Sequence, residues 1–241
     1  MEVAPRSLKP KPLYRQVRDE LVRRIVEGAW AAGQAIPSEF EIAADLGVSQ
    51  GTVRKALDEM AAERLVVRLQ GKGTFVARHD DARILFQFFR LLPDTGEVRF
   101  PESRVLGVTA RPATRADAQA LGIAAGAPVI AFERVRFLDE TPCILERIVL
   151  SEAMFPGLAA RGLPNNLYDL YATAFGVTIA GATERLKAMV AGPHEAEHLA
   201  VAPGTPLLVV DRIATALDGR IGEWRVSICR TDHWHYKAEL R

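Results

Sequence analysis

Two histidines and a glutamate near the end of the chain have the spacing of a zinc-hydrolase motif. The stretch PHEAEH, residues 193–198, contains His194, Glu195 and His198 as His-Glu-x-x-His. On a helix, histidines at positions i and i+4 lie on one face, where both imidazoles can bind one Zn²⁺ ion and the intervening Glu can act as general base. A hydrolase would also need a third ligand and a cleft, and the neighbouring pattern indicates neither.

Two arginines point to a different chemistry, the binding of an anion. Arg134 and Arg136 alternate within an apolar segment that predicts a β-strand, so their side chains lie on the same face. Two guanidinium groups on one face can hold a carboxylate or a phosphate through paired hydrogen bonds. The alternative is a ladder of surface ion pairs with Glu133, Glu146 or Asp139.

An internal repeat decides how the histidine motif is interpreted. Residues 115–136 align with residues 193–214 at a constant offset of 78 positions. The alignment predicts two copies of a helix–turn–strand unit within one sheet. In the first copy, Ala116 and Ala120 occupy the positions of the two histidines, so the helix has the same structural role there without a metal ligand. We therefore predict a solvated helix and no metal site.

The composition predicts a cytoplasmic protein large enough for two domains. The 241 residues are 49% hydrophobic and 25% charged, and the net charge is +1, as in ordinary globular proteins. No apolar run approaches the ~20 residues that cross a bilayer, and the first residues lack the apolar core of a signal peptide, so we expect no membrane partner. Cys143 and Cys229 fit no disulfide or metal pattern and are expected to be free thiols.

The first third of the chain predicts a helix-turn-helix. Residues 12–28 place an apolar side chain at every fourth position, which indicates an amphipathic helix. Ser38 and Glu41 form an S-x-x-E capping box that starts a second helix, and Gly47 ends it. Ser49 follows almost at once as the cap of a third helix. Two helices joined by so short a turn cross steeply, as in helix-turn-helix proteins.

The outward face of the third helix carries side chains that can read DNA. Gln50 can make paired hydrogen bonds to adenine, Arg54 can bind guanine or a phosphate, and Gly51 permits close approach of the backbone. Lys55 lies on the same side. Residues 65–79 then predict two short strands around the basic tip Gln-Gly-Lys-Gly, which is suited to lie along a groove. The order of these elements predicts a winged helix.

Three stretches of this region are PLYRQVRDELVRRIVEGAW, IPSEFEIAADLGVSQGTVRKALDEM and RLQGKGTFV. They resemble the DNA-binding domain of GntR-family bacterial transcription regulators, and the resemblance covers nearly all of residues 10–77. It implies a double-stranded DNA operator with an inverted repeat as partner. Phe40 and Gln50 stand where many members have arginine, so we expect a different operator. The predicted DNA-binding residues are Ser38, Glu39, Ser49, Gln50, Gly51, Thr52, Arg54, Lys55, Gln70, Gly71, Lys72, Gly73 and Thr74.

Later stretches include FPESRVL, ERVRF, LERIVL, FPGL, NNLYDLYATAFGVTI, ERLKA, LAVAPGTPLLVVDRIA and GEWRVSICRTDHWHY. They resemble the effector-binding domain of the HutC subgroup of GntR regulators, which is related in fold to chorismate lyase. The resemblance spans about residues 84–241 and implies an antiparallel sheet with flanking helices, a homodimer and a buried small-molecule site. Asn166 stands where sugar-phosphate-sensing relatives often have serine. The predicted effector-binding residues are Arg134, Arg136, Glu146, Asn166, Tyr168, Glu223 and Tyr236.

The sequence thus predicts an α+β protein in three parts. These are a winged helix-turn-helix DNA-binding domain (1–77), a connector (78–83), and an effector-binding and dimerisation domain of chorismate-lyase-like type (84–241). We expect a homodimeric repressor, without cofactor or catalytic residues, that leaves its operator when a small anionic effector binds. The alternative from another class is a zinc-dependent or lyase-like enzyme carrying a DNA-binding module; a lyase fold alone does not support it.

Overall fold

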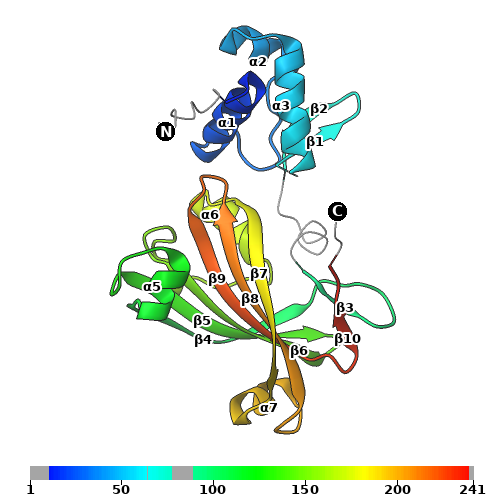
Figure 1. Ribbon diagram of the computed structural model, residues 1–241, viewed down its shortest axis with the longest axis vertical. Helices are drawn as coiled ribbons and strands as arrows, with labels where there is room; N and C mark the ends of the chain where they lie inside the picture. The colour runs from blue at the N-terminus through cyan, green and yellow to red at the C-terminus, as the bar shows by residue number, and fades with distance from the viewer. Residues whose placement is uncertain (1–10, 64, 78–88, 239–241) are drawn as a thin grey trace, which may run out of the picture. The chain divides into compact units, whose positions relative to one another are not determined.

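The computed structural model forms two compact units, Met1–Ala77 and Arg78–Arg241 (Figure 1). The residues it describes are 11–63, 65–77 and 89–238. The predicted connector, residues 78–83, lies outside them. In the described part of the chain, no helix combines the length and the apolar character needed to cross a membrane.

The first unit consists of three helices followed by a two-stranded hairpin. Its elements are α1 (Leu13–Val26), α2 (Glu39–Leu46), α3 (Gln50–Ala62), β1 (Val66–Leu69) and β2 (Gly73–Val76). Local chemistry sets the helix ends. Ser38 and Glu41 form the capping box of α2, and the Ser49 hydroxyl accepts the Thr52 N–H at the start of α3. Gly47 ends α2 at φ 64°, a left-handed conformation that glycine adopts without steric cost.

The core of the first unit fixes which side of α3 faces outward. Leu21 of α1 packs in the interior, as do Val53, Leu57 and Met60 of α3, and all four are fully buried. Burying such a side chain stabilises the fold by about 1.5–3 kcal/mol. Because these residues recur at helical spacing, the opposite face of α3 with its polar side chains must lie toward solvent.

The second unit is built on a six-stranded antiparallel sheet in the order β4-β5-β6-β9-β8-β7 (Figure 1). Its strands are β4 (Glu102–Pro112), β5 (Pro128–Leu138), β6 (Thr141–Ser151), β7 (Ile179–Val190), β8 (Pro206–Ala216) and β9 (Ile221–Cys229). Neighbours β5 and β6, or β8 and β9, are joined by short turns. The central pairing of β6 with β9 instead places Glu146 beside Ser227, far along the chain.

Helices cover both faces of this sheet. They are α5 (Arg115–Leu121), η1 (Leu158–Ala160), α6 (Leu167–Phe175) and α7 (Pro193–Leu199). Along β5, Val129 and Val135 pack toward α5 and α7, whereas Ile130 and Phe132 pack toward η1 and α6. This alternation is the period of two that a strand imposes on its side chains.

The predicted internal repeat is confirmed by the element boundaries. Helix α5 begins at Arg115 and strand β5 at Pro128, while α7 begins at Pro193 and β8 at Pro206. Both pairs are therefore separated by the predicted 78 positions. The two copies form equivalent helix–strand units of one sheet.

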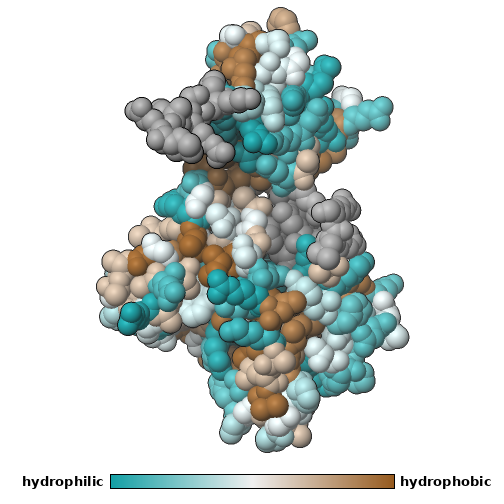
Figure 2. Space-filling view, viewed as in Figure 1, coloured by the Kyte–Doolittle hydropathy of each residue, from teal (hydrophilic) through white to brown (hydrophobic). Residues whose placement is uncertain are grey.

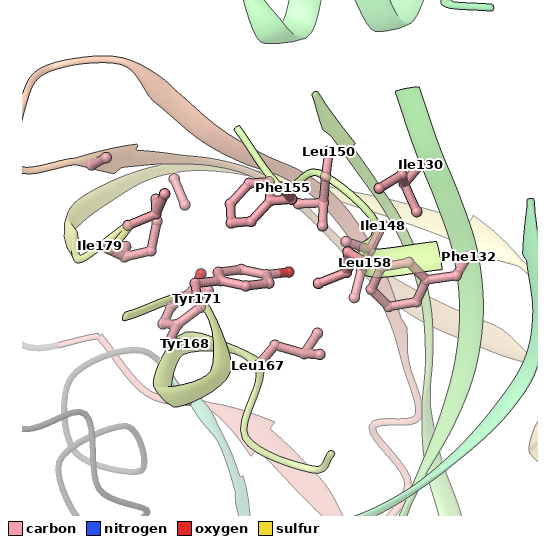
Figure 3. Close-up of a cluster of buried hydrophobic side chains, with 13 residues drawn as sticks. Ile130, Phe132, Ile148, Leu150, Phe155, Leu158, Leu167, Tyr168, Tyr171 and Ile179 are labelled. Atoms are coloured by element: carbon pink, nitrogen blue, oxygen red, sulfur yellow. The ribbon is translucent and has the colours of Figure 1, made fainter. Parts of the chain in front are cut away.

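Two apolar clusters occupy the face of the sheet that carries α6. In the first cluster, Tyr168 and Tyr171 of α6 lie against Ile148 and neighbouring side chains (Figure 3). The second cluster packs Ile144 and Val210 under a small sheet of two strands. Those strands are β3 (Leu91–Pro93) and β10 (Trp234–Tyr236). Charged side chains that the strands carry between the two clusters are consequently enclosed.

Candidate functional site

The predicted DNA-binding residues lie at the surface of the first unit. On α3, Gln50, Gly51, Arg54 and Lys55 are exposed, opposite the buried core residues of that helix. The β1–β2 turn, residues 70–73, is exposed as well. Helix α3 and the β1–β2 hairpin are thus both accessible to a partner.

A carboxylate of α2 orients the basic side chains of this face. Glu39 Oε2 accepts a hydrogen bond from Arg54 Nε at 2.9 Å, and its Oε1 lies 3.2 Å from Arg68 Nη2. The Lys55 ammonium lies 4.2 Å from the centroid of the Tyr14 ring, a cation–π contact. Because Arg54 is exposed, its ion pair is weak and can be exchanged for a contact to DNA. Glu39 therefore positions Arg54 in the DNA-free protein.

Three of the predicted DNA-binding residues also stabilise the local fold, whereas Gly51 does not. The hydroxyls of Ser38 and Ser49 cap α2 and α3, and Thr52 Oγ1 lies 2.9 Å from Ser49 Oγ. Thr74 is half-buried in β2. A Cβ added at Gly51 would have only Ser49 Oγ nearby, at 3.8 Å. The glycine is therefore not required by the packing of the protein itself.

The second unit contains a cavity on the α6 face of the sheet. Six of the seven predicted effector-binding residues line it: Arg134, Arg136, Glu146, Asn166, Tyr168 and Tyr236. The seventh, Glu223, is fully buried behind this wall and accepts a hydrogen bond from the Tyr168 hydroxyl at 3.1 Å. The structure thus brings all seven residues together.

A chain of buried ion pairs forms one side of the cavity. Arg134 Nε donates to Glu146 Oε2 at 2.5 Å, and Arg225 Nη1 donates to Glu146 Oε1 at 3.1 Å. Arg225 also binds both carboxylate oxygens of Glu223, at 2.9 and 2.7 Å. Burial raises the pKa of Glu146, but Arg134 and Arg225 outweigh it and hold the pKa well below its usual range. These side chains form a rigid scaffold of mutually satisfied charges.

Hydrogen bonds from α6 and its preceding loop complete this scaffold. The Tyr171 hydroxyl donates to Glu223 Oε2 at 2.9 Å. Burial raises the pKa of Tyr168 to about 12, so its hydroxyl stays protonated at neutral pH. The carbonyl oxygen of Asn165 accepts Arg134 Nη1 at 3.1 Å. The loop before α6 is therefore anchored to β5 through the same arginine that binds Glu146.

Arg136 is buried without a carboxylate partner among the described residues. Its side chain is 2% exposed, and its Nη2 donates to the carbonyl oxygen of Pro101 at 3.2 Å. The guanidinium lies 4.8 Å from the Phe100 ring and 5.4 Å from the Phe89 ring, while no described residue accepts a hydrogen bond from Nε. Burial and the nearby Arg134 lower the pKa of Arg136 to about 9, so it remains charged at neutral pH. An anion could satisfy both its charge and its free N–H.

Ser103 places a second free donor beside Arg136. The two residues are cross-strand partners in β4 and β5. The Ser103 N–H points away from β5, to Asn165 Oδ1 at 2.7 Å, so this is a non-hydrogen-bonded pair, in which the side chains are closest. Ser103 Oγ is buried and finds no hydrogen-bond partner in the described part of the chain. Two neighbouring unsatisfied donors are the arrangement that an acceptor such as a carboxylate oxygen completes.

Sequence reasoning missed Ser103, Arg212 and Arg225. Arg212 Nε donates to Glu184 at 2.6 Å and lines the cavity. The repeat contained a signal for it, because Arg212 occupies the position of Arg134 in the second copy. Arg225 alternates with Glu223 along one strand, a pattern that could have been read like that of Arg134 and Arg136. Ser103 carries no such local signal.

The His-Glu-x-x-His stretch has a structural role in α7. His194 Nε2 lies 3.3 Å from Glu133 Oε2. Glu195 binds Arg147 at 2.8 Å and accepts the Gly192 N–H at the helix start at 3.2 Å. Among the residues that the structure describes, no group of three or more His, Cys, Asp or Glu side chains is placed to hold a metal ion. The carboxylate that a hydrolase would use as base is thus engaged in capping the helix.

Comparisons with known proteins match both units of the chain. Residues 13–76 match the bacterial regulatory proteins of the gntR family, and residues 97–235 match the UTRA domain. The chain is 30% identical over 213 residues to the HTH-type transcriptional regulator SmoD of Agrobacterium fabrum, covering 88% of this chain and 89% of SmoD. The chain belongs to the GntR family of transcription regulators.

Further relatives of this GntR regulator agree with that assignment. It is 28% identical over 211 residues to the histidine utilization repressor of Pseudomonas putida, covering 87% of this chain and 85% of the repressor. The ligand-binding domain of a GntR-family regulator from Bordetella bronchiseptica superposes with a TM-score of 0.58 at 36% identity, covering 64% of this chain and 98% of that domain. The predicted family and α+β fold class are confirmed. Because the relatives are transcription regulators, the enzyme alternative has no support.

Proposed function

We propose that this GntR regulator is a cytoplasmic homodimeric repressor of an inverted-repeat operator. A small anionic effector in the cavity releases it from DNA. The observation that carries the proposal is Arg136, a buried cation whose Nε and charge lack a partner in the described residues. An unpaired buried charge is costly, so its presence needs an explanation, and a ligand that completes it supplies one. The histidine utilization repressor among the relatives supports repression as the direction of control.

The charges around the cavity support an anionic effector. Four buried arginines surround it, and three carboxylates pair with them: Arg134, Arg136, Arg212 and Arg225 against Glu146, Glu184 and Glu223. The positive charge of Arg136 is left over, and the half-buried Arg90 also lines the cavity. A carboxylate or phosphate oxygen held by Arg136 Nε and Ser103 Oγ balances this positive charge. Asn166 and Tyr236 then face the rest of the molecule.

The first unit reads DNA through α3 and the wing. Gln50 contacts a base edge in the major groove, and Arg54 exchanges Glu39 for a phosphate or a guanine. A two-fold symmetric dimer presents two recognition helices, so the half-sites are related by the same axis. Selection of operator variants from a random library tests this reading. Gln50→Ala should change the preferred base at one position of each half-site, and an unchanged preference would place α3 in another orientation.

The effector site is tested by a metabolite screen followed by operator release. Small carboxylic acids are screened for those that raise the melting temperature and release the operator. Arg136→Ala should bind operator normally yet need at least about 100-fold more effector for release, since alanine cannot donate the charge-assisted hydrogen bonds of a guanidinium. Arg136→Lys should restore release only in part, because an ammonium lacks the planar fork. Arg220→Ala, an exposed arginine on the β8–β9 turn, is the matched control. Normal release by Arg136→Ala would place the effector elsewhere.

A further inference from the structure

Phe40, in the first turn of α2, exposes an aromatic ring on the surface of the first unit. It is 68% exposed, the largest exposed fraction among the large apolar residues that the structure describes. Figure 2 shows hydrophobic surface at the end of this unit where α2 lies, bordered by hydrophilic surface. Single apolar residues are common on protein surfaces, so the exposure alone indicates no function. The surroundings of the ring are what distinguish it.

The contacts of α2 place Phe40 beside the exposed face of α3. The preceding residue, Glu39, accepts a hydrogen bond from Arg54 of α3 at 2.9 Å. On the other flank of α2, Asp45 Oδ2 lies 2.7 Å from Arg24 Nη1 of α1. Phe40 and Asp45 are five residues apart, which is about 140° around a helix axis, so the ring points away from α1. It therefore lies on the outer side of α2, next to the first two turns of α3.

In a helix-turn-helix, this position lies at the edge of the major groove. The second helix enters the groove with its N-terminal residues at the base edges, and the helix before it crosses the DNA backbone. Because Glu39 contacts Arg54 directly, the first turn of α2 lies within one side-chain length of α3. A ring at Phe40 thus reaches the bases next to those that Gln50 and Arg54 contact in the proposed function.

The chemistry of the ring selects one group on the DNA. A phenyl ring has no hydrogen-bonding group, so it cannot read the polar edges of the bases and gains nothing from a phosphate. The major groove presents one apolar group, the C5-methyl of thymine, and phenylalanine is among the side chains that contact it. The exposed ring of Phe40 and this methyl group are therefore complementary.

We propose that Phe40 selects a thymine in each half-site of the operator by covering its 5-methyl group. The inference rests on the proposed reading of DNA through α3 and adds an apolar contact to the polar contacts of Gln50 and Arg54. The negative charge beside the ring does not oppose it. Glu39 Oε1 lies 3.2 Å from Arg68 Nη2, and this pair remains when Arg54 turns to the DNA.

The surroundings of Phe40 disfavour another protein as the occupant. In β1, the exposed Val67 and Leu69 alternate with Arg68, which turns toward α2. The two apolar side chains therefore face away from α2. On α2 itself, Ala44 is the one further exposed apolar residue. A stable protein interface buries about 800 Å² on each partner, which one ring and one methyl group do not supply.

The test removes single methyl groups from the operator that is selected from the random library. Deoxyuridine lacks only the 5-methyl group of thymidine, so each symmetric pair of thymines is replaced in turn. At one pair, the affinity of the full chain should fall about 15-fold, which is about fourfold for each methyl group. A factor of four corresponds to about 0.8 kcal/mol, the value of one buried carbon.

Variants of Phe40 show whether this residue causes the methyl effect. Phe40→Ala should weaken operator binding and no longer respond to deoxyuridine at that pair. Alanine favours a helix, so its circular dichroism should match that of the parent chain. Phe40→Leu keeps an apolar side chain and should retain part of the response. Val98→Ala is the matched control, because Val98 is 44% exposed in the second unit; it should respond like the parent.

The outcomes separate this proposal from the one it rests on. An equal loss of affinity in the parent and in Phe40→Ala at every thymine would overturn the contact, and so would normal operator binding by Phe40→Ala. If Gln50→Ala and Arg54→Ala also bind and select as the parent does, the orientation of α3 is wrong. If they differ from the parent, only the role of Phe40 is wrong. A methyl effect that is present in the parent and absent in Phe40→Ala confirms the contact.

Discussion

Replacing Arg134 or Arg136 by methionine tests whether the first arginine holds the fold together while the second is free for the proposed effector. The two side chains lie on the same face of β5 and are 1% and 2% exposed, so neither position nor burial distinguishes them. Their contacts do. Arg134 binds Glu146 and the Asn165 carbonyl, whereas Arg136 has one hydrogen bond and a free Nε. We therefore expect different effects on the stability of the effector-free protein.

Arg134→Met should strongly destabilise the second unit. Removing one partner of a buried ion pair costs about 3–5 kcal/mol, because the other charge is left uncompensated. Glu146 keeps Arg225 Nη1 at 3.1 Å and Ser227 Oγ at 3.4 Å, which places the cost near the lower end, about 3 kcal/mol. For a domain of this size each kcal/mol shifts the melting temperature by about 2–4 °C. The expected decrease is therefore about 6–12 °C.

Arg136→Met should leave stability unchanged or raise it. The substitution removes a hydrogen bond to Pro101, worth about 1 kcal/mol, and ring contacts to Phe100 and Phe89, worth about 1–2 kcal/mol. It also removes a buried charge whose desolvation costs several kcal/mol without compensation by a carboxylate. These contributions cancel approximately, and the methionine side chain keeps the apolar contacts.

Urea denaturation of the effector-free variants, followed by the fluorescence of Trp224 and Trp234, measures this contrast. Arg220→Met, on the exposed turn, controls for the removal of an arginine as such. A loss of stability in Arg136→Met as large as that in Arg134→Met would show that Arg136 has a structural function. The reasoning that reserves it for an effector would then be wrong.

Three further outcomes are expected. Arg54→Ala should weaken operator binding. Titrations from low to high salt should also show that the slope of log affinity against log salt concentration falls by ~1 for each phosphate that is no longer neutralised. An unchanged affinity would exclude Arg54 from the interface. Gly51→Ala should stabilise the first unit by about 0.5 kcal/mol in thermal unfolding, since the added Cβ meets only Ser49 Oγ at 3.8 Å. The same substitution should reduce operator affinity at least about tenfold. Normal affinity would mean that DNA does not approach the backbone at Gly51. Glu146 has a pKa below its usual 4.5 in the folded protein, so its stabilising charge is present above pH ~4.5 and disappears as the pH falls toward the folded pKa. The difference in unfolding free energy between the parent chain and Glu146→Gln should therefore shrink below pH ~4.5. A pH-independent difference would contradict the role of the Glu146 charge.

The DNA-binding unit could be predicted from sequence because its determinants are local. Ser38 and Glu41 stand three residues apart and cap α2 directly, and Gly47 ends that helix at a positive φ. The outward face of α3 follows from the spacing of its buried residues. These inferences need no knowledge of long-range contacts, so the predicted helix boundaries and the predicted outward face of α3 agree closely with the structure.

The cavity of the second unit could be predicted only in part, because its geometry depends on strand order. The alternation of Arg134 and Arg136 placed both on one face from sequence alone. Arg225, however, meets Glu146 from 79 residues away, through the pairing of β6 with β9. Strand order across such a distance leaves no periodic signal. The different roles of the two arginines were equally inaccessible, since they follow from which carboxylates and donors each one reaches.

The position of Phe89 connects the cavity to the DNA-binding unit through the chain itself. The first unit ends at Ala77, and Phe89 is the first described residue of the second. Its ring lies 5.4 Å from the Arg136 guanidinium and lines the cavity. An effector can change operator affinity only through its different affinities for the DNA-bound and released states, typically about 1–3 kcal/mol. An effector that binds Arg136, as we propose, therefore also contacts Phe89 at the start of the second unit, and its release of the operator requires no more than this difference in affinity.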